Sequence, residues 1–194
     1  MGRPPRHDAD SLLDAAVGLS AAGGPQAVTM AAVIAAAGAP SGSLYHRFPG
    51  RPALQAALWL RTLERFQAGF LAAAAGADGP AAALGAAAHT VAWSRAHPAE
   101  ARILLYGAAD FGCDSWPERE RARLLARQAE VTTAIGALTA KLGLGGADGR
   151  ERVVLATVDI PLALVRRHLL AGEPVPQSAE RLIEPAVRAL LALD

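Results

Sequence analysis

The chain has 194 residues and a formal net charge of +1 at pH 7, and 52% of its residues are hydrophobic. This apolar content is enough for a sizeable core and excludes an intrinsically disordered chain. The balanced charge excludes a protein that coats DNA through a strong positive field, but it allows a site-specific binder with a few well-placed arginines.

The chain carries a single cysteine, Cys113, which excludes an intrachain disulfide framework and a multi-cysteine metal site. The first ten residues lack the apolar core of a signal peptide. The most apolar stretch, 153–165, is interrupted by Asp159 and Pro161 and is shorter than the ~20 residues that cross a bilayer. We therefore expect a cytoplasmic protein that does not contact a membrane.

The chain opens with Gly2–His7, which contains two arginines and two prolines. Two interpretations are open: an arm that lies along a DNA groove, or a frayed terminus. A first helix is expected from Asp8 to Ala22, because apolar residues such as Leu12 and Leu13 then recur on one side. It should end at the glycines and the proline of 23–25.

The segment from Thr29 to Phe48 has the pattern of two short helices joined by a tight turn. Thr29 can cap the first helix, Met30–Ala37, by accepting a backbone N–H with its hydroxyl. Gly38 can end that helix with a positive φ, and Pro40 suits the start of the next. The pattern predicts a helix-turn-helix.

The second of these helices, from Pro40 or Ser41 to about Phe48, has two different faces. Leu44 and Phe48 are four residues apart and can pack on the first helix. The opposite face offers hydroxyl and imidazole groups, which can bond to phosphates and base edges in a major groove. These groups belong to Ser41, Ser43, Tyr45 and His46.

This turn-helix unit is similar to the DNA-binding signature of the tetracycline-repressor (TetR) family, A-G-V-S-x-G-x-L-Y-x-H-F-x-x-K. The run AAAGAPSGSLYHRFPGR carries the likeness, which covers about the first 60 residues. The matching positions are Ala37, Gly38, Gly42, Leu44, Tyr45 and Phe48, with Thr29 before them and the basic Arg51 after them. Pro40 replaces the usual serine and Arg47 the usual histidine, and both remain compatible with DNA binding.

The resemblance implies a nine-helix homodimer that binds a palindromic operator and is released by a small effector. Tyr45 can donate to a phosphate. Arg51 stands at a helix N-terminus, where a cation does not suit the helix dipole, so we expect an external anion as its partner. The predicted DNA-binding residues are Thr29, Ser41, Ser43, Tyr45, His46, Arg47 and Arg51.

The rest of the chain continues in helices, expected at about 51–75, 80–97, 99–109, 117–141, 150–171 and 178–193. A loop is expected at 112–116 and a turn at 143–149. Pro161 and Pro185 should kink their helices, since each removes a backbone hydrogen bond at a cost of ~3 kcal/mol.

Most aromatic residues lie between Trp59 and Trp116, and some of them could line a ligand cavity, although aromatic residues at helical spacing more often form a core. The candidate ligand-binding residues are Phe66, Phe70, Trp93, Arg102, Tyr106, Phe111 and Trp116. His89 could also fix a polar ligand. His89 and His97 have no carboxylate at ligand spacing, so we expect no metal and no cofactor.

The last helix carries a broad apolar stripe at i, i+3, i+4 and i+7 spacing. One chain of this size need not bury such a stripe alone, which favours a homodimer joined by the last two helices. The predicted interface residues are Leu182, Ile183, Val187 and Leu190.

No enzyme motif accompanies these features: Ser41-Gly42-Ser43, for example, lacks the strand and the spacing of a nucleophile elbow. We predict an all-α protein with a DNA-binding domain at 1–51 and a ligand-binding and dimerisation domain at 52–194. Its predicted function is transcriptional repression of an operator, relieved by a small molecule. The alternative is a helical interaction protein or enzyme scaffold in which the helix-turn-helix is only structural.

Overall fold

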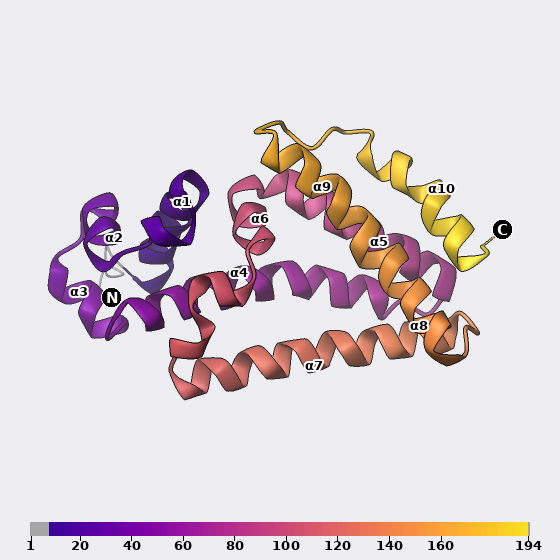
Figure 1. Cartoon of the computed structure of the whole chain (residues 1–194), viewed down its shortest axis with the longest axis horizontal. Coiled ribbons are helices and arrows are strands. Elements are labelled where there is room, and N and C mark those ends of the chain that lie inside the picture. The colour runs from indigo at the N-terminus through magenta and orange to yellow at the C-terminus, as the bar shows by residue number, and fades with distance from the viewer. Residues whose placement is uncertain (1–7, 194) are drawn as a thin grey trace, which may run out of the picture. The chain divides into compact units, whose positions relative to one another are not determined.

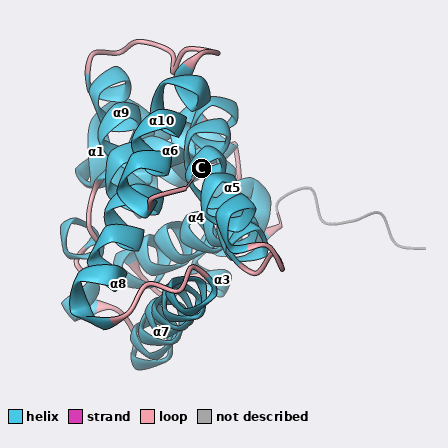
Figure 2. Ribbon diagram, turned by 90° about the vertical axis from the view of Figure 1, so that its right-hand side faces the viewer, coloured by secondary structure: helices cyan, strands magenta, loops and turns pink. Residues whose placement is uncertain are grey.

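The computed structural model describes residues 8–193. Every regular element in this range is a helix, and short connections make up the remainder (Figures 1 and 2), which confirms the all-α class. The segment Gly2–His7, for which two interpretations were open, lies outside the described residues.

The helices begin and end close to the predicted positions. Their bounds are α1 (Ala9–Ala27), α2 (Met30–Ala37), α3 (Ser41–Arg47), α4 (Arg51–Ala74), α5 (Gly79–Ala96), α6 (Pro98–Leu105), α7 (Glu118–Lys141), α8 (Gly146–Val154), α9 (Ile160–Leu170) and α10 (Ala179–Leu191). Three shorter turns are η1 (Ala108–Phe111), η2 (Cys113–Ser115) and η3 (Leu155–Asp159). Because η3 joins α8 to α9 without a break, the described residues form nine α-helices.

One helix end and two connections differ from the prediction. The first helix was expected to end at Ala22, but α1 continues to Ala27 across non-helical backbone angles at Gly23 and Gly24. The segment 99–109 is not one helix, because α6 ends before Gly107, whose N–H donates to the Asp110 carboxylate at 2.7 Å and so starts a separate 3-10 turn. The turn expected at 143–149 is shorter, and α8 begins within it. Gly143, with φ at 66°, already reverses the chain after α7, so the following residues are free to enter a helix.

The connection between α8 and α9 is a π turn that lies directly before Pro161. The N–H of Ile160 donates to the carbonyl of Leu155, five residues back. Proline has no N–H to donate and its ring crowds the preceding turn, so a wider turn lets the helix pass it. The disturbance expected at Pro161 therefore takes this form, whereas α10 runs through Pro185 as one helix.

Contacts between residues divide the chain into two units, which are described separately. Unit 1 is the chain up to Leu63 together with Ala99–Leu125, and unit 2 is Glu64–Pro98 together with Ala126–Asp194. Unit 1 thus contains all of the predicted DNA-binding segment and also later parts of the chain. The predicted boundary after residue 51 stays a prediction.

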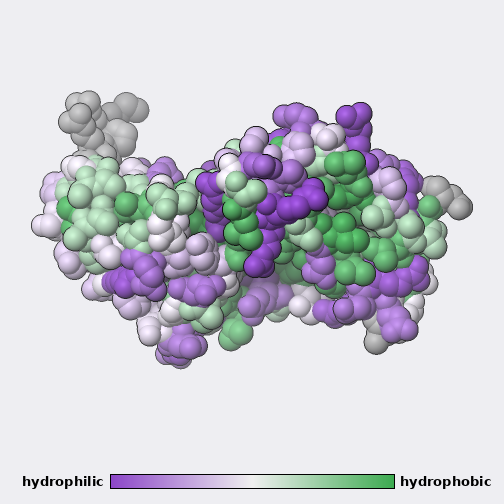
Figure 3. Space-filling view, turned by 45° about the horizontal axis from the view of Figure 1, so that its top comes forward, coloured by the Kyte–Doolittle hydropathy of each residue, from purple (hydrophilic) through white to green (hydrophobic). Residues whose placement is uncertain are grey.

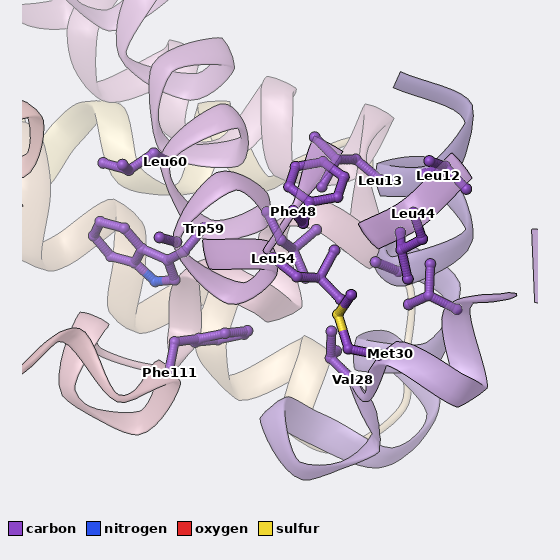
Figure 4. Packing of buried hydrophobic residues seen from close by; sticks show 14 of the residues in the cluster. Leu12, Leu13, Val28, Met30, Leu44, Phe48, Leu54, Trp59, Leu60 and Phe111 are labelled. Atoms are coloured by element: carbon purple, nitrogen blue, oxygen red, sulfur yellow. The ribbon is translucent and has the colours of Figure 1, made fainter. Parts of the chain in front are cut away.

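Unit 1 has a hydrophobic core built from its three short N-terminal helices and the first turns of α4. Leu12 of α1, Leu44 of α3 and Leu54 of α4 are completely buried and belong to one cluster with Phe48 (Figure 4). The buried Phe111 extends this core to the segment that follows α6. The helix-turn-helix is therefore supported by packing and is not an isolated motif.

In unit 2, α10 packs along α5, and α5 also contacts η3 and α9. The Arg95 guanidinium holds the Glu180 carboxylate with two nitrogens at the start of α10. These hydrogen bonds, opposed in part by desolvation, hold the pKa of Glu180 below its usual range. Near the other end of α10, Arg152 Nε donates to the carbonyl of Leu190 at 2.7 Å.

Candidate nucleic-acid interface

The turn of the helix-turn-helix is fixed by local caps. Thr29 Oγ1 accepts the N–H of Ala32 at 3.1 Å, which caps α2 as predicted. Gly38 takes φ of 59° at the end of α2, and the Ala39 N–H donates back to the Ile34 carbonyl at 3.2 Å. The Thr29 hydroxyl oxygen is thus used as an acceptor in this cap. The predicted contact of Thr29 with DNA stays a prediction.

The two faces of α3 are as different as its sequence indicates. Leu44 is completely buried, and Phe48, just after the helix, is 7% exposed. Ser41, Tyr45 and His46 are exposed, and Tyr45 is 54% accessible. Hydroxyl and imidazole groups therefore face solvent on a helix whose apolar side packs on the core.

The remaining predicted contact residues of α3 are less accessible. Ser43 is half-buried. Arg47, also half-buried, donates from Nη1 to the Ser43 carbonyl at 3.2 Å. Its charge also contributes to the lowered pKa of Asp8, which is caused first by hydrogen bonds from Ser11. Part of the Arg47 guanidinium is therefore used inside unit 1.

Arg51 has partners that its position in the sequence did not suggest. Its Nε donates to the Val28 carbonyl at 3.0 Å, and its Nη2 lies 3.3 Å from the Pro25 carbonyl and 3.0 Å from Gln26 Oε1. The argument that Arg51 needs an external anion is therefore wrong, because the end of α1 supplies acceptors. Its contact with a phosphate remains untested.

The candidate ligand-binding residues are divided between the two units. In unit 2, Phe66 lies beside Phe70, Trp93 and His89, at ring distances of 6.2, 5.3 and 5.4 Å. Phe70 is almost completely buried there, whereas Phe66 and Trp93 are half-buried.

The other candidates belong to unit 1. Tyr106 meets Phe111 edge to face at 6.3 Å, and Trp116 Nε1 donates to the Phe111 carbonyl at 2.8 Å. Phe111 and Trp116 are at most 2% exposed and belong to the core. For these two residues the structure therefore favours a core over the lining of a ligand cavity. Arg102 is half-buried.

The predicted dimer residues on α10 do not form one free stripe. Ile183 and Val187 are at most 4% exposed, because this side of α10 packs on α5 of the same chain. Leu190 is half-buried, and Leu182 is 61% exposed. Hydrophobic residues remain on the surface over α9 and α10 (Figure 3), including Leu170 at 68% exposure.

Two further properties of residues 8–193 bear on partners. Within this range, no three histidine, cysteine, aspartate or glutamate side chains gather as they would around a metal ion. No helix there has the length and apolar character needed to cross a bilayer.

Comparison with known proteins matches the segment that contains the helix-turn-helix. Residues 12–58 match the family described as "Bacterial regulatory proteins, tetR family". No match was found among curated proteins.

Among solved structures, similar folds include a bacterial regulatory protein in the tetR family from Rhodococcus RHA1, with a TM-score of 0.72, 17% identity and 95% of each chain covered. A TetR-like transcriptional regulator from Rhodococcus sp. RHA1 has a TM-score of 0.70 and 20% identity, with 98% of each chain covered. The ketosteroid transcriptional regulator KstR2 of Mycobacterium tuberculosis has a TM-score of 0.68 and 18% identity, covering 98% of this chain and 97% of its own. Residues 12–58 are therefore similar to the tetR family of bacterial regulatory proteins, and over nearly its full length the chain has the fold of these regulators.

Proposed function

We propose that the protein is a transcriptional repressor that binds an operator as a homodimer in the cytoplasm and leaves it when a small molecule binds. The observation that carries the DNA-binding part is the polar surface of α3, on which Ser41, Tyr45 and His46 are exposed while Leu44 is buried in the core. A short helix that packs on a core with one side and exposes hydroxyl and imidazole groups can enter the major groove of DNA.

Selection from a random-sequence DNA pool by the full-length protein tests this directly. We expect enrichment of a two-fold symmetric sequence, because two identical heads read two identical half-sites. A Ser41→Ala/Tyr45→Phe/His46→Ala variant should fold but lose the enrichment, since the three side chains lie outside the core. No enriched sequence with the wild type would contradict the proposal.

The dimer is proposed to form through exposed leucines of the last helices. Leu170 and Leu182 are more than half exposed, and Leu155 and Leu162 are 39% and 38% exposed. Burying these side chains against a second copy would remove apolar surface from water. Two heads held about one DNA turn apart, roughly 34 to 36 Å, would then read a symmetric operator.

Light scattering at micromolar concentration tests the dimer. We expect a dimeric wild type and a monomeric Leu170→Arg/Leu182→Arg variant, because two arginines cannot be buried unpaired in the interface. The matched control is Leu125→Arg, since Leu125 is similarly exposed at 65% but lies on α7. A monomeric wild type would contradict this part of the proposal.

The effector is proposed to be a small, largely apolar molecule that binds in unit 2 beside the half-buried rings of Phe66 and Trp93. Support comes from α4, which carries Arg51 and Gln55 in unit 1 and Phe66 in unit 2 on one continuous helix. A shift of α4 on ligand binding would then alter the DNA-binding unit. A 100-fold loss of operator affinity needs only about 2.7 kcal/mol of coupling.

A thermal-stabilisation screen should find ligands, and titration of one ligand with and without operator DNA measures the coupling. By reciprocity, operator must weaken ligand binding by the same factor that ligand weakens operator binding. Equal ligand affinities in the two titrations would contradict the coupling for that ligand.

A further inference from the structure

The backbone carbonyls at the end of α1 are only partly satisfied by the backbone itself, where the Val28 N–H donates to the Pro25 carbonyl at 3.3 Å. The helix is interrupted at Gly23 and Gly24, and only two residues, Val28 and Thr29, separate it from α2. The last carbonyls of a helix need donors from elsewhere, and here both Pro25 and Val28 are buried away from water. Within α1 the last turn carries no basic side chain to complement the negative end of the dipole.

Two side chains one turn apart on α4 supply the donors. Arg51 reaches three carbonyls, those of Pro25, Gln26 and Val28, at 3.3, 3.4 and 3.0 Å. Gln55, which is 8% exposed, adds a bond from Nε2 to the Pro25 carbonyl at 3.1 Å. Side chains at the start of α4 therefore hold residues 25–29, the junction between α1 and α2, by hydrogen bonds.

The hydrogen bonds at this junction depend on the planar guanidinium group of Arg51. Nε of Arg51 faces Val28 while Nη2 faces Pro25 and Gln26, so two nitrogens of one rigid plane bond in different directions. A lysine ammonium is a single point charge and cannot reach acceptors on all these residues at once. A phosphate contact, in contrast, is satisfied by either cation.

We propose that Arg51 is a positioning residue, which sets the place of α2 and α3 by holding the carbonyls at the end of α1. Thr29, the cap of α2, directly follows the Val28 that Arg51 holds. A displacement of α2 should also move α3, because the two helices are in contact and their Val33 and Leu44 belong to the same hydrophobic core. The inference rests on the proposed DNA binding.

The test uses the full-length protein and a DNA fragment enriched by the wild type from a random-sequence pool. Arg51→Lys keeps the positive charge but removes the planar guanidinium with its several donors. We therefore expect the Kd of this variant for the DNA fragment to rise about tenfold. Amide exchange in residues 28–37 should accelerate at the same time, because the junction loosens. The matched control is Arg61→Lys on the same helix, which bonds the exposed carboxylates of Asp10 and Asp14 and should change Kd little.

The salt dependence of Kd provides a second readout, which a general loss of stability does not move. Arg51→Lys keeps the positive charge, so its Kd should rise while the slope of log Kd against log salt stays that of the wild type. Wild-type affinity in Arg51→Lys, or wild-type amide exchange in residues 28–37 of that variant, would overturn the positioning role. If the wild type enriches no DNA, the proposed function fails instead, so the two failures are distinguishable.

Discussion

Gly69 in α4 is a position where the effect of a substitution should depend on one neighbour. A Cβ added there would lie 2.1 Å from His89 Cε1 and 2.7 Å from Nδ1, far inside van der Waals contact. The imidazole is held in place by the Phe66 carbonyl, which lies 2.9 Å from Nε2, and by the Phe66 ring at 5.4 Å. A carbonyl can only accept, so Nε2 carries the hydrogen. Gly69→Ala must therefore displace the ring.

The magnitude follows from opposing effects. Alanine is favoured over glycine inside a helix by about 1 kcal/mol. Displacing the His89 ring costs about 2 to 3 kcal/mol of packing and hydrogen bonding, so Gly69→Ala should destabilise the protein by about 1 to 2 kcal/mol. In a His89→Ala background the obstacle is gone, and the same substitution should stabilise by about 1 kcal/mol. The sign reverses, with a coupling of about 2 to 3 kcal/mol.

Urea unfolding of the wild type, both single variants and the double variant measures this cycle. We expect Gly69→Ala to lower the midpoint in the wild type and to raise it in His89→Ala. If Gly69→Ala stabilises both backgrounds equally, the contact between α4 and α5 has been described wrongly.

Three further predictions concern single positions. Tyr45→Phe should weaken operator binding by about 1 kcal/mol without changing the melting temperature, because the side chain is 54% exposed; anisotropy titration and thermal unfolding check this. Glu180→Gln should lower the free energy of unfolding by about 1 to 2 kcal/mol near neutral pH. Since Arg95 lowers the pKa of Glu180, that loss should shrink as the pH falls through the lowered pKa and be absent below it, which urea unfolding against pH measures. Gly24→Ala should destabilise by about 1 to 2 kcal/mol in urea unfolding, because φ is 69° there, whereas Gly18→Ala in the same helix meets nothing within 4 Å and should stabilise slightly.

The helix-turn-helix was predictable from the sequence because its determinants are local. The cap at Thr29, the left-handed Gly38 and the proline at the start of α3 act within a few residues of one another. Spacing alone placed Leu44 inside and Tyr45 outside, and the structure agrees. The same holds for most helix bounds.

The features that the sequence did not reveal depend on residues far apart in the chain. The acceptors of Arg51 lie 23 to 26 residues before it, so no local pattern indicates them. The burial of Ile183 and Val187 depends on which side of α10 meets α5, and an apolar stripe alone does not distinguish a neighbour in the same chain from a second copy. The division of aromatic residues between two units is likewise a property of the tertiary fold.

Sequence-specific DNA binding is the central claim, and a comparison of two affinities tests it most directly. The enriched fragment and an unrelated fragment of the same length are titrated with the full-length protein at one physiological salt concentration. The account predicts that the enriched fragment binds at least about 10³-fold more tightly, as expected for specific readout. Equal affinities would show that the exposed face of α3 reads no sequence, and would contradict the assignment.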